Sequence, residues 1–138
     1  VNAFIPETYI PSAAQRIDMY KKIAAIENEA DEREIMDELI DRYGEPPRSV
    51  QNIISVAALK IPARAVGCRE ITQRGGAVTL TFAPDKLTPS IVFGLDNSYT
   101  GRVKVISGDT PKLRVTMRDK DKNALMFISK LLSDIEAL

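Results

Sequence analysis

Four carboxylates crowd one predicted helix and are the residues best placed to do chemistry in this chain. Glu34, Glu38 and Asp41 follow i, i+4, i+7 spacing within residues 31–43, and Asp37 lies beside them. Arg42 is close enough to soften their repulsion. Such a group suits acid–base catalysis, a divalent cation, a docking surface for a basic partner, or a plain solvated face.

Composition argues against catalysis and against metal binding. The chain has no histidine, which removes the commonest general base, the commonest transition-metal ligand and every Ser-His-Asp or Cys-His arrangement. Cys68 has no second cysteine, so we expect a small, partly buried residue at a helix-to-strand junction. The acidic spacing matches no calcium loop, and a regular helix points its carboxylates outward. We therefore predict no catalytic residue, no cofactor-binding residue and no metal ligand in this chain.

Two interpretations of the acidic helix remain open on sequence physics alone. Clustered acids repel one another, and a basic partner would offset that repulsion while setting register and association rate. A solvated face with no partner is the alternative. In the first interpretation the protein-interaction residues are Glu34, Asp37, Glu38, Asp41 and Arg42.

The charge of the chain is balanced overall but uneven along its length. Residues 1–47 hold 5 Lys and Arg against 11 Asp and Glu, whereas residues 48–138 hold 14 against 8. This asymmetry predicts either a polarised surface or acidic helices that neutralise basic strands. The basic half raises a second hypothesis, a DNA-contacting sheet face. Its candidate residues are Arg69, Arg74, Arg102, Lys104, Lys112 and Arg114.

Helical periodicity dominates the chain up to residue 67. A first helix is predicted over 12–28, with Ser12 and Gln15 as a capping box, and a second over 31–43, with Asp31 and Glu34 in the same roles. A third is predicted over 47–67, with Pro62 expected to kink or end it. The apolar stripes of the first two helices comprise Ile17, Tyr20, Ile23, Ala24 and Ile26, then Ile35, Met36, Leu39, Ile40 and Tyr43.

The period then changes from that of a helix to that of a strand. Residues 69–74 and 77–83 flank Gly75-Gly76, and residues 102–107 and 112–117 flank a second turn. Residues 88–98 fit a short helix or a loop, and a last helix is predicted over 121–137. This order predicts an α+β fold, in which N-terminal helices precede an antiparallel sheet of two hairpins and a C-terminal helix.

Length and composition predict one domain of ordinary size over residues 12–138, preceded by a connecting arm over 1–11. The chain starts with Val, and we expect a fragment of a longer protein. No apolar run is long enough to span a membrane, and no signal segment is seen. One cysteine is typical of a cytosolic protein.

Three motifs carry a resemblance to a known family. They are IPETYI (5–10), RIDMYKKIA (16–24) and ELIDRYGEPP (38–47), followed by the long apolar segment 47–67. Together they resemble the C-terminal domain of the bacterial transcription-repair coupling factors, the Mfd family. The likeness extends over essentially the whole chain, although the strand half matches only in pattern. Pro62 departs from the uninterrupted helix of other family members.

The resemblance implies a function for the parent protein and a role for this domain. The parent would be an ATP-driven DNA translocase that removes stalled RNA polymerase and recruits UvrA for nucleotide excision repair in the bacterial cytoplasm. ATP and Mg²⁺ would bind its motor domains, and none would bind here. This domain would be an autoinhibitory module that covers the UvrA-binding surface of the N-terminal module. Glu38 and Asp41 match the acidic contact positions of the family.

Overall fold

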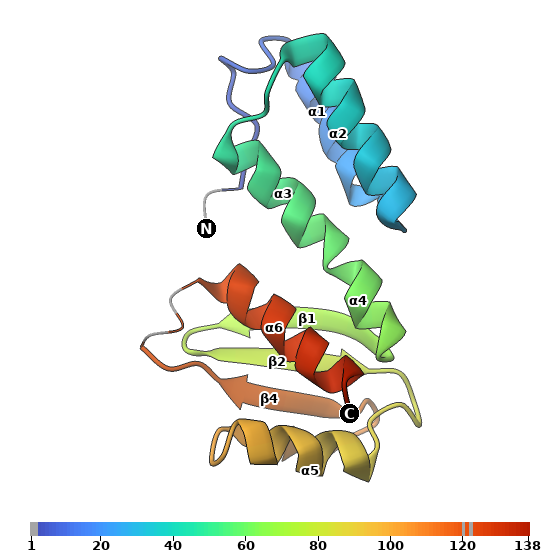
Figure 1. Cartoon of the computed structure of the whole chain (residues 1–138), viewed down its shortest axis with the longest axis vertical. Helices are drawn as coiled ribbons and strands as arrows, with labels where there is room; N and C mark the ends of the chain where they lie inside the picture. Colours follow the sequence, from blue (N-terminus) through green and yellow to red (C-terminus); the bar gives the residue numbers. More distant parts are fainter. Residues whose placement is uncertain (1–2, 120, 122) are drawn as a thin grey trace. The chain divides into compact units, whose positions relative to one another are not determined.

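The computed structural model describes residues 3–119, 121 and 123–138, and Figure 1 shows their secondary structure. The chain divides into two compact units, Val1–Ile61 and Pro62–Leu138, which we describe separately. The first unit is helical, and the second combines an antiparallel sheet with helices. The predicted α+β class is confirmed, while a single domain over 12–138 stays a prediction. Residues 1–2 of the predicted arm and 122 of the predicted last helix lie outside the described residues.

The first unit begins with α1 (Ala13–Ala24), which Ser12 caps as predicted. The Ser12 hydroxyl accepts a hydrogen bond from the Gln15 N–H at 3.2 Å. The other half of the predicted capping box is wrong. The Gln15 side chain accepts a hydrogen bond from the Tyr43 hydroxyl at 3.0 Å, because α2 brings that hydroxyl within reach.

Helix α2 (Glu29–Tyr43) begins two residues earlier than predicted, because Asn28 and not Asp31 is its cap. The Asn28 side chain accepts from the Asp31 N–H at 2.8 Å, and the Asp31 carboxylate accepts from the Glu27 N–H at 2.9 Å. Each therefore satisfies a backbone donor at the helix start. The helix ends at Tyr43, and Gly44 follows as its cap with a φ of +84°, a conformation that favours glycine.

The predicted arm contributes to the core of the first unit. Ile10 is fully buried and Ile5 is nearly so, among apolar side chains of α1, α2 and α3 (Arg48–Ala58). The Tyr9 hydroxyl donates to the Gly44 carbonyl at 2.7 Å, so the arm also covers the end of α2. In contrast, Ile17, Tyr20 and Ile40 are 57%, 39% and 43% exposed, so parts of the two predicted apolar stripes are not buried.

Pro62 interrupts the third helix, as predicted. Helix α3 ends at Ala58 and α4 (Lys60–Ala65) follows after Leu59. Proline has no N–H to bond the carbonyl four residues earlier, and its ring clashes with that carbonyl. The carbonyl in question belongs to Ala58, the last residue of α3, which accounts for the position of the break.

The second unit is built on a four-stranded sheet. Its strands are β1 (Cys68–Arg74), β2 (Ala77–Phe82), β3 (Val103–Ile106) and β4 (Lys112–Thr116), in the spatial order β1-β2-β4-β3. Both predicted hairpins are present, and antiparallel pairing of β2 with β4 joins them. Arg74 pairs with Ala77 across Gly75-Gly76, and Gly75 has a φ of +58°. Strands β1 and β3 are therefore the two edges.

Two helices cover one face of this sheet (Figure 1). Residues 88–98, ambiguous in sequence, contain α5 (Pro89–Ser98), which Thr88 caps by accepting from the Ile91 N–H. Helix α6 (Ala124–Glu136) packs on α5, with the rings of Tyr99 and Phe127 edge to face at 6.0 Å. The buried sheet residues are Cys68, Val78, Leu80, Phe82, Leu113 and Val115. The opposite face carries exposed threonines and charges, as in many antiparallel sheets.

Candidate functional site

The structure places the four predicted acids on the solvent side of α2. Ile35 and Leu39 are buried on the opposite side of the helix, so the intervening acids project outward. We call Glu34, Asp37, Glu38 and Asp41 the acidic ridge. Three of its members are exposed, and Glu38 is half-buried. The four acids therefore do share one face of the helix, although they differ in exposure.

The negative charge of Glu38 is balanced by two cations of the first unit. Its carboxylate accepts from the Lys22 ammonium of α1 at 3.0 Å and from the Arg42 guanidinium at 2.9 Å. The hydrogen bond from Lys22 is the main reason why the pKa of Glu38 lies below its ordinary value. Burial acts in the opposite direction, and the hydrogen bond from Arg42 lowers the pKa further. This carboxylate links α2 to α1, a contact that the sequence did not predict.

Arg42 is likewise held within the unit. Its guanidinium lies 5.0 Å from the centre of the Tyr43 ring as well as on Glu38. It also sits in the last turn of α2, where a cation favours the helix dipole. The predicted interaction set thus separates into two residues with internal partners and three, Glu34, Asp37 and Asp41, that form no ion pair with any described residue.

The described residues provide no alternative centre for metal or thiol chemistry. Among them, no group of three His, Cys, Asp or Glu side chains is placed to hold a metal ion. Cys68 is buried, more completely than the partial burial that we predicted, and its thiol donates to the Glu70 carbonyl at 3.3 Å. Burial raises the pKa of this thiol, which disfavours the reactive thiolate. None of the described helices has both the length and the apolar character that crossing a membrane would require.

The basic sheet face contains four of its six predicted residues. Lys104 lies opposite Arg114 in the β3–β4 register, and Arg114 lies opposite Thr79 in the β2–β4 register. Lys112 and Arg74 share that face, because they lie opposite Thr81 and Ala77. None of the four cations forms an ion pair with an acid in the described part of the chain.

The other two predicted residues do not belong to this face. Arg102 has a side chain only 14% exposed, because its guanidinium pairs with Asp121 at 2.8 Å and lies over the rings of Tyr99 and Phe127. Arg69 falls at an irregularity in the β1–β2 pairing, between Cys68 and Glu70, so its alternation with the other strand residues is lost. Sequence alternation alone shows neither the ion pair nor the bulge.

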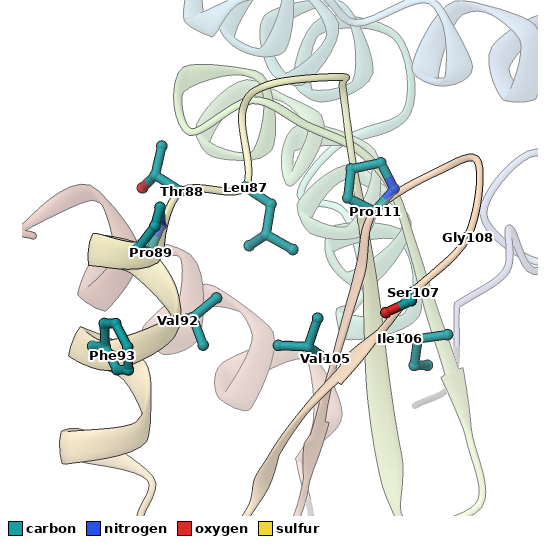
Figure 2. Close-up of a pocket in the computed structure, with 10 residues that line it drawn as sticks. All are labelled: Leu87, Thr88, Pro89, Val92, Phe93, Val105, Ile106, Ser107, Gly108 and Pro111. Atoms are coloured by element: carbon teal, nitrogen blue, oxygen red, sulfur yellow. The ribbon is translucent and has the colours of Figure 1, made fainter.

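A groove of about 430 Å³ at the edge of the sheet was not predicted from sequence. Figure 2 shows Leu87, Val92 of α5 and Val105 of β3 pointing toward one another in this groove. Val105 is 46% exposed and Phe93 of α5 is 70% exposed. The apolar face of the sheet thus continues past the area that α5 covers.

Comparison with known proteins decides the family. The model of the TRCF domain matches residues 1–90, which include α1 to α4, β1, β2 and the acidic ridge. This chain belongs to the TRCF domain family. Over its full length the chain is 32% identical to the transcription-repair-coupling factor of Bacillus subtilis strain 168 but spans only 12% of that protein. The protein of the same name in Escherichia coli K12 is 30% identical over 67% of this chain, which is 8% of that protein. The one in Mycobacterium tuberculosis is 32% identical over 73% of this chain, again 8% of that protein.

The fold of this TRCF domain is also found in a solved structure. The crystal structure of the C-terminal domain of a transcription-repair coupling factor aligns with a TM-score of 0.70 at 22% identity. The alignment covers 99% of this chain and 90% of that one. The predicted resemblance is therefore confirmed, including the strand half, which matched only in pattern in the sequence.

Proposed function

We propose that this TRCF domain is a non-catalytic regulatory domain that docks through its acidic ridge within a transcription-repair coupling factor. The observation that supports this most is the exposed triplet Glu34, Asp37 and Asp41, which has no cationic partner among the described residues. A basic surface would relieve the repulsion among these acids. The partner is the N-terminal, UvrA-binding module of the same protein, and docking covers its UvrA-binding surface.

In this proposal the ridge residues have two roles. Asp37, Asp41 and Glu34 meet the cations of the partner. Glu38 and Arg42 lie at the border of the contact, and the ion pairs of Glu38 with Lys22 and Arg42 hold the ridge in place on α1. A polar contact of modest area suits a covering domain that must be released.

The parent protein supplies the activities that this domain lacks. We propose an ATP-dependent DNA translocase that acts on stalled RNA polymerase, recruits UvrA and binds duplex DNA in the bacterial cytoplasm. ATP and Mg²⁺ belong to its motor domains. Membership of the TRCF family supports this assignment.

Removing two charges from the ridge tests the docking. Asp37→Asn together with Asp41→Asn is expected to weaken binding of this chain to the separate N-terminal module about tenfold, since two screened but complementary charges are lost. The measurement is isothermal titration calorimetry at two salt concentrations, followed by a pull-down with UvrA as competitor. The wild-type affinity should fall with added salt, and that of the variant should fall less.

The matched control removes the same charge from the other unit. Asp96→Asn with Glu136→Gln changes two exposed acids outside the ridge and should leave the affinity unchanged. Equal weakening by both double variants would show a general effect of net charge. Unchanged affinity in the ridge variant, with an unaltered circular dichroism spectrum, would remove the proposed role of the ridge.

A second candidate function, contact with DNA, is favoured by one observation. Lys104 and Arg114 lie directly opposite each other, although like charges in that position destabilise a sheet. Fluorescence anisotropy with a duplex of about 20 base pairs at low salt checks this candidate. Submillimolar, salt-sensitive binding that falls several-fold in Arg114→Gln would support it, whereas equal binding by Arg114→Gln and wild type would refute it.

A further inference from the structure

The groove beside β3 brings together an unpaired strand edge and exposed apolar side chains. Strand β3 is an edge of the sheet, so its backbone is paired only with β4. Beside it the groove exposes apolar side chains of β3 and α5, among them Val105 and Phe93. Figure 2 shows the groove between the helix and the strand edge. An extended peptide can pair its backbone with the β3 edge and place alternate side chains in the groove.

The backbone register identifies the free hydrogen-bonding groups. The Arg102 carbonyl accepts from the Thr116 N–H at 2.9 Å, which makes Arg102 and Thr116 a hydrogen-bonded pair. Because antiparallel pairs alternate, Lys104 and Ile106 also bond to β4, whereas Val103 and Val105 direct their N–H and C=O groups away from the sheet. Among the described residues no strand lies beside these groups, so they are available to an added strand.

The charges next to this edge define the partner further. On a strand added beside β3, the residue opposite Lys104 lies on the same face as Lys104 and Arg114, which are cationic and have no ion pair with a described residue. An acidic side chain fits that position. Its two sequence neighbours point to the other face, toward the apolar groove. The complementary segment therefore alternates acidic and apolar residues.

We propose that β3 and α5 form a binding site for an extended segment of a partner protein with alternating acidic and apolar residues, which adds to the sheet as a fifth strand. The site lies in the second unit and is independent of the acidic ridge. A second copy of this chain is a poor occupant. Two-fold antiparallel pairing centred on β3 places Lys104 against Lys104, with Arg114 behind each.

The test uses the whole chain and a synthetic peptide, Glu-Val-Glu-Val-Glu-Val-Glu, acetylated and amidated. In a two-dimensional ¹H–¹⁵N NMR titration, shift changes are expected in β3 and α5. A peptide of the same composition in the order Glu-Glu-Val-Val-Val-Glu-Glu lacks the alternation and should bind at least about tenfold more weakly. Equal binding by the two peptides, or no binding by the alternating one, overturns the proposal.

Variants separate backbone pairing from charge. Val105→Pro removes an outward N–H but no bond to β4, and proline is tolerated on edge strands, so binding should fall at least about tenfold with the fold retained. If Val105→Pro unfolds, Phe93→Ser removes an exposed groove side chain instead and should also weaken binding. Unchanged binding in a folded Val105→Pro, or in Phe93→Ser where Val105→Pro unfolds, overturns the proposal.

Lys104→Glu and Arg74→Glu make the same charge change at opposite edges of the same sheet face. Only Lys104→Glu should weaken peptide binding, by about tenfold. Equal weakening by both would indicate a surface that attracts any polyanion, DNA included, and would overturn strand addition. Dimerisation of the chain in sedimentation experiments, abolished by Val105→Pro, would assign the edge to a second copy and overturn the proposal as well.

Discussion

Ile10→Ala is expected to destabilise the first unit by about 2–5 kcal/mol, because it empties a fully buried site between the arm and the helices. The arm has no regular secondary structure of its own there, so side-chain packing and hydrogen bonds attach it. The Tyr9 hydroxyl donates to the Gly44 carbonyl, the Ile5 N–H donates to the Tyr20 hydroxyl, and the Arg16 guanidinium donates to the Ile10 carbonyl. Loss of the Ile10 side chain should therefore also loosen the end of α2. The measurement is native-state hydrogen exchange of the amides in α1, α2 and α3.

Ile17→Ala is the matched control for this prediction. The substitution is the same, but Ile17 is 57% exposed on α1, and alanine has the higher helix propensity. Its effect on the free energy of unfolding should stay within about 0.5 kcal/mol. Similar losses in the two variants would mean that the arm is not part of this core. A large loss in Ile17→Ala alone would mean that α1 buries its other face.

Phe82→Ala is expected to destabilise the second unit by about 3–5 kcal/mol, the cost of emptying a large buried site. Phe82 is fully buried on the inner face of β2, opposite Cys68 of β1. The protection of amides in β1, β2 and β4 against hydrogen exchange should fall together, because these strands share that face. Urea unfolding followed by circular dichroism gives the total change in stability.

Phe93→Ala makes the same substitution on α5, where the ring is 70% exposed. Its stability should change by no more than about 0.5 kcal/mol, as for other exposed positions. An equal loss in Phe82→Ala and Phe93→Ala would contradict the orientation of α5. Comparing the hydrogen exchange of Ile10→Ala and Phe82→Ala also tests the predicted single domain, because a joint loss of protection in both units requires joint unfolding.

Local signals in the sequence predicted most of the secondary structure. Glycine pairs and changes of period are properties of short segments, so Gly75-Gly76 predicted the β1–β2 hairpin and Pro62 predicted the interruption after α3. The start of α2 was wrong by two residues because Asn28 and Asp31 can both cap a helix. The choice between them depends on which donors the arriving chain presents.

Longer-range features of the candidate site were decided by packing. The sequence identified the acids on α2, but only the contact of α1 with α2 shows that Lys22 neutralises Glu38 and leaves Asp37 and Asp41 exposed. In the same way, the alternation of basic residues predicted that six cations share one sheet face. Arg102 does not belong to that face, because its guanidinium pairs with Asp121.

The α+β class, the family motifs and the lack of histidine chemistry follow from residue types and local spacing, which the chain shows before it folds. Packing between the elements settled which apolar and charged side chains gain partners. Helix periodicity marks an apolar stripe, but the neighbouring elements determine how much of it is covered, which is why Ile23 of α1 is buried and Ile17 is not. The strand order likewise made β3 an edge, since any of the strands could have occupied that position on sequence alone.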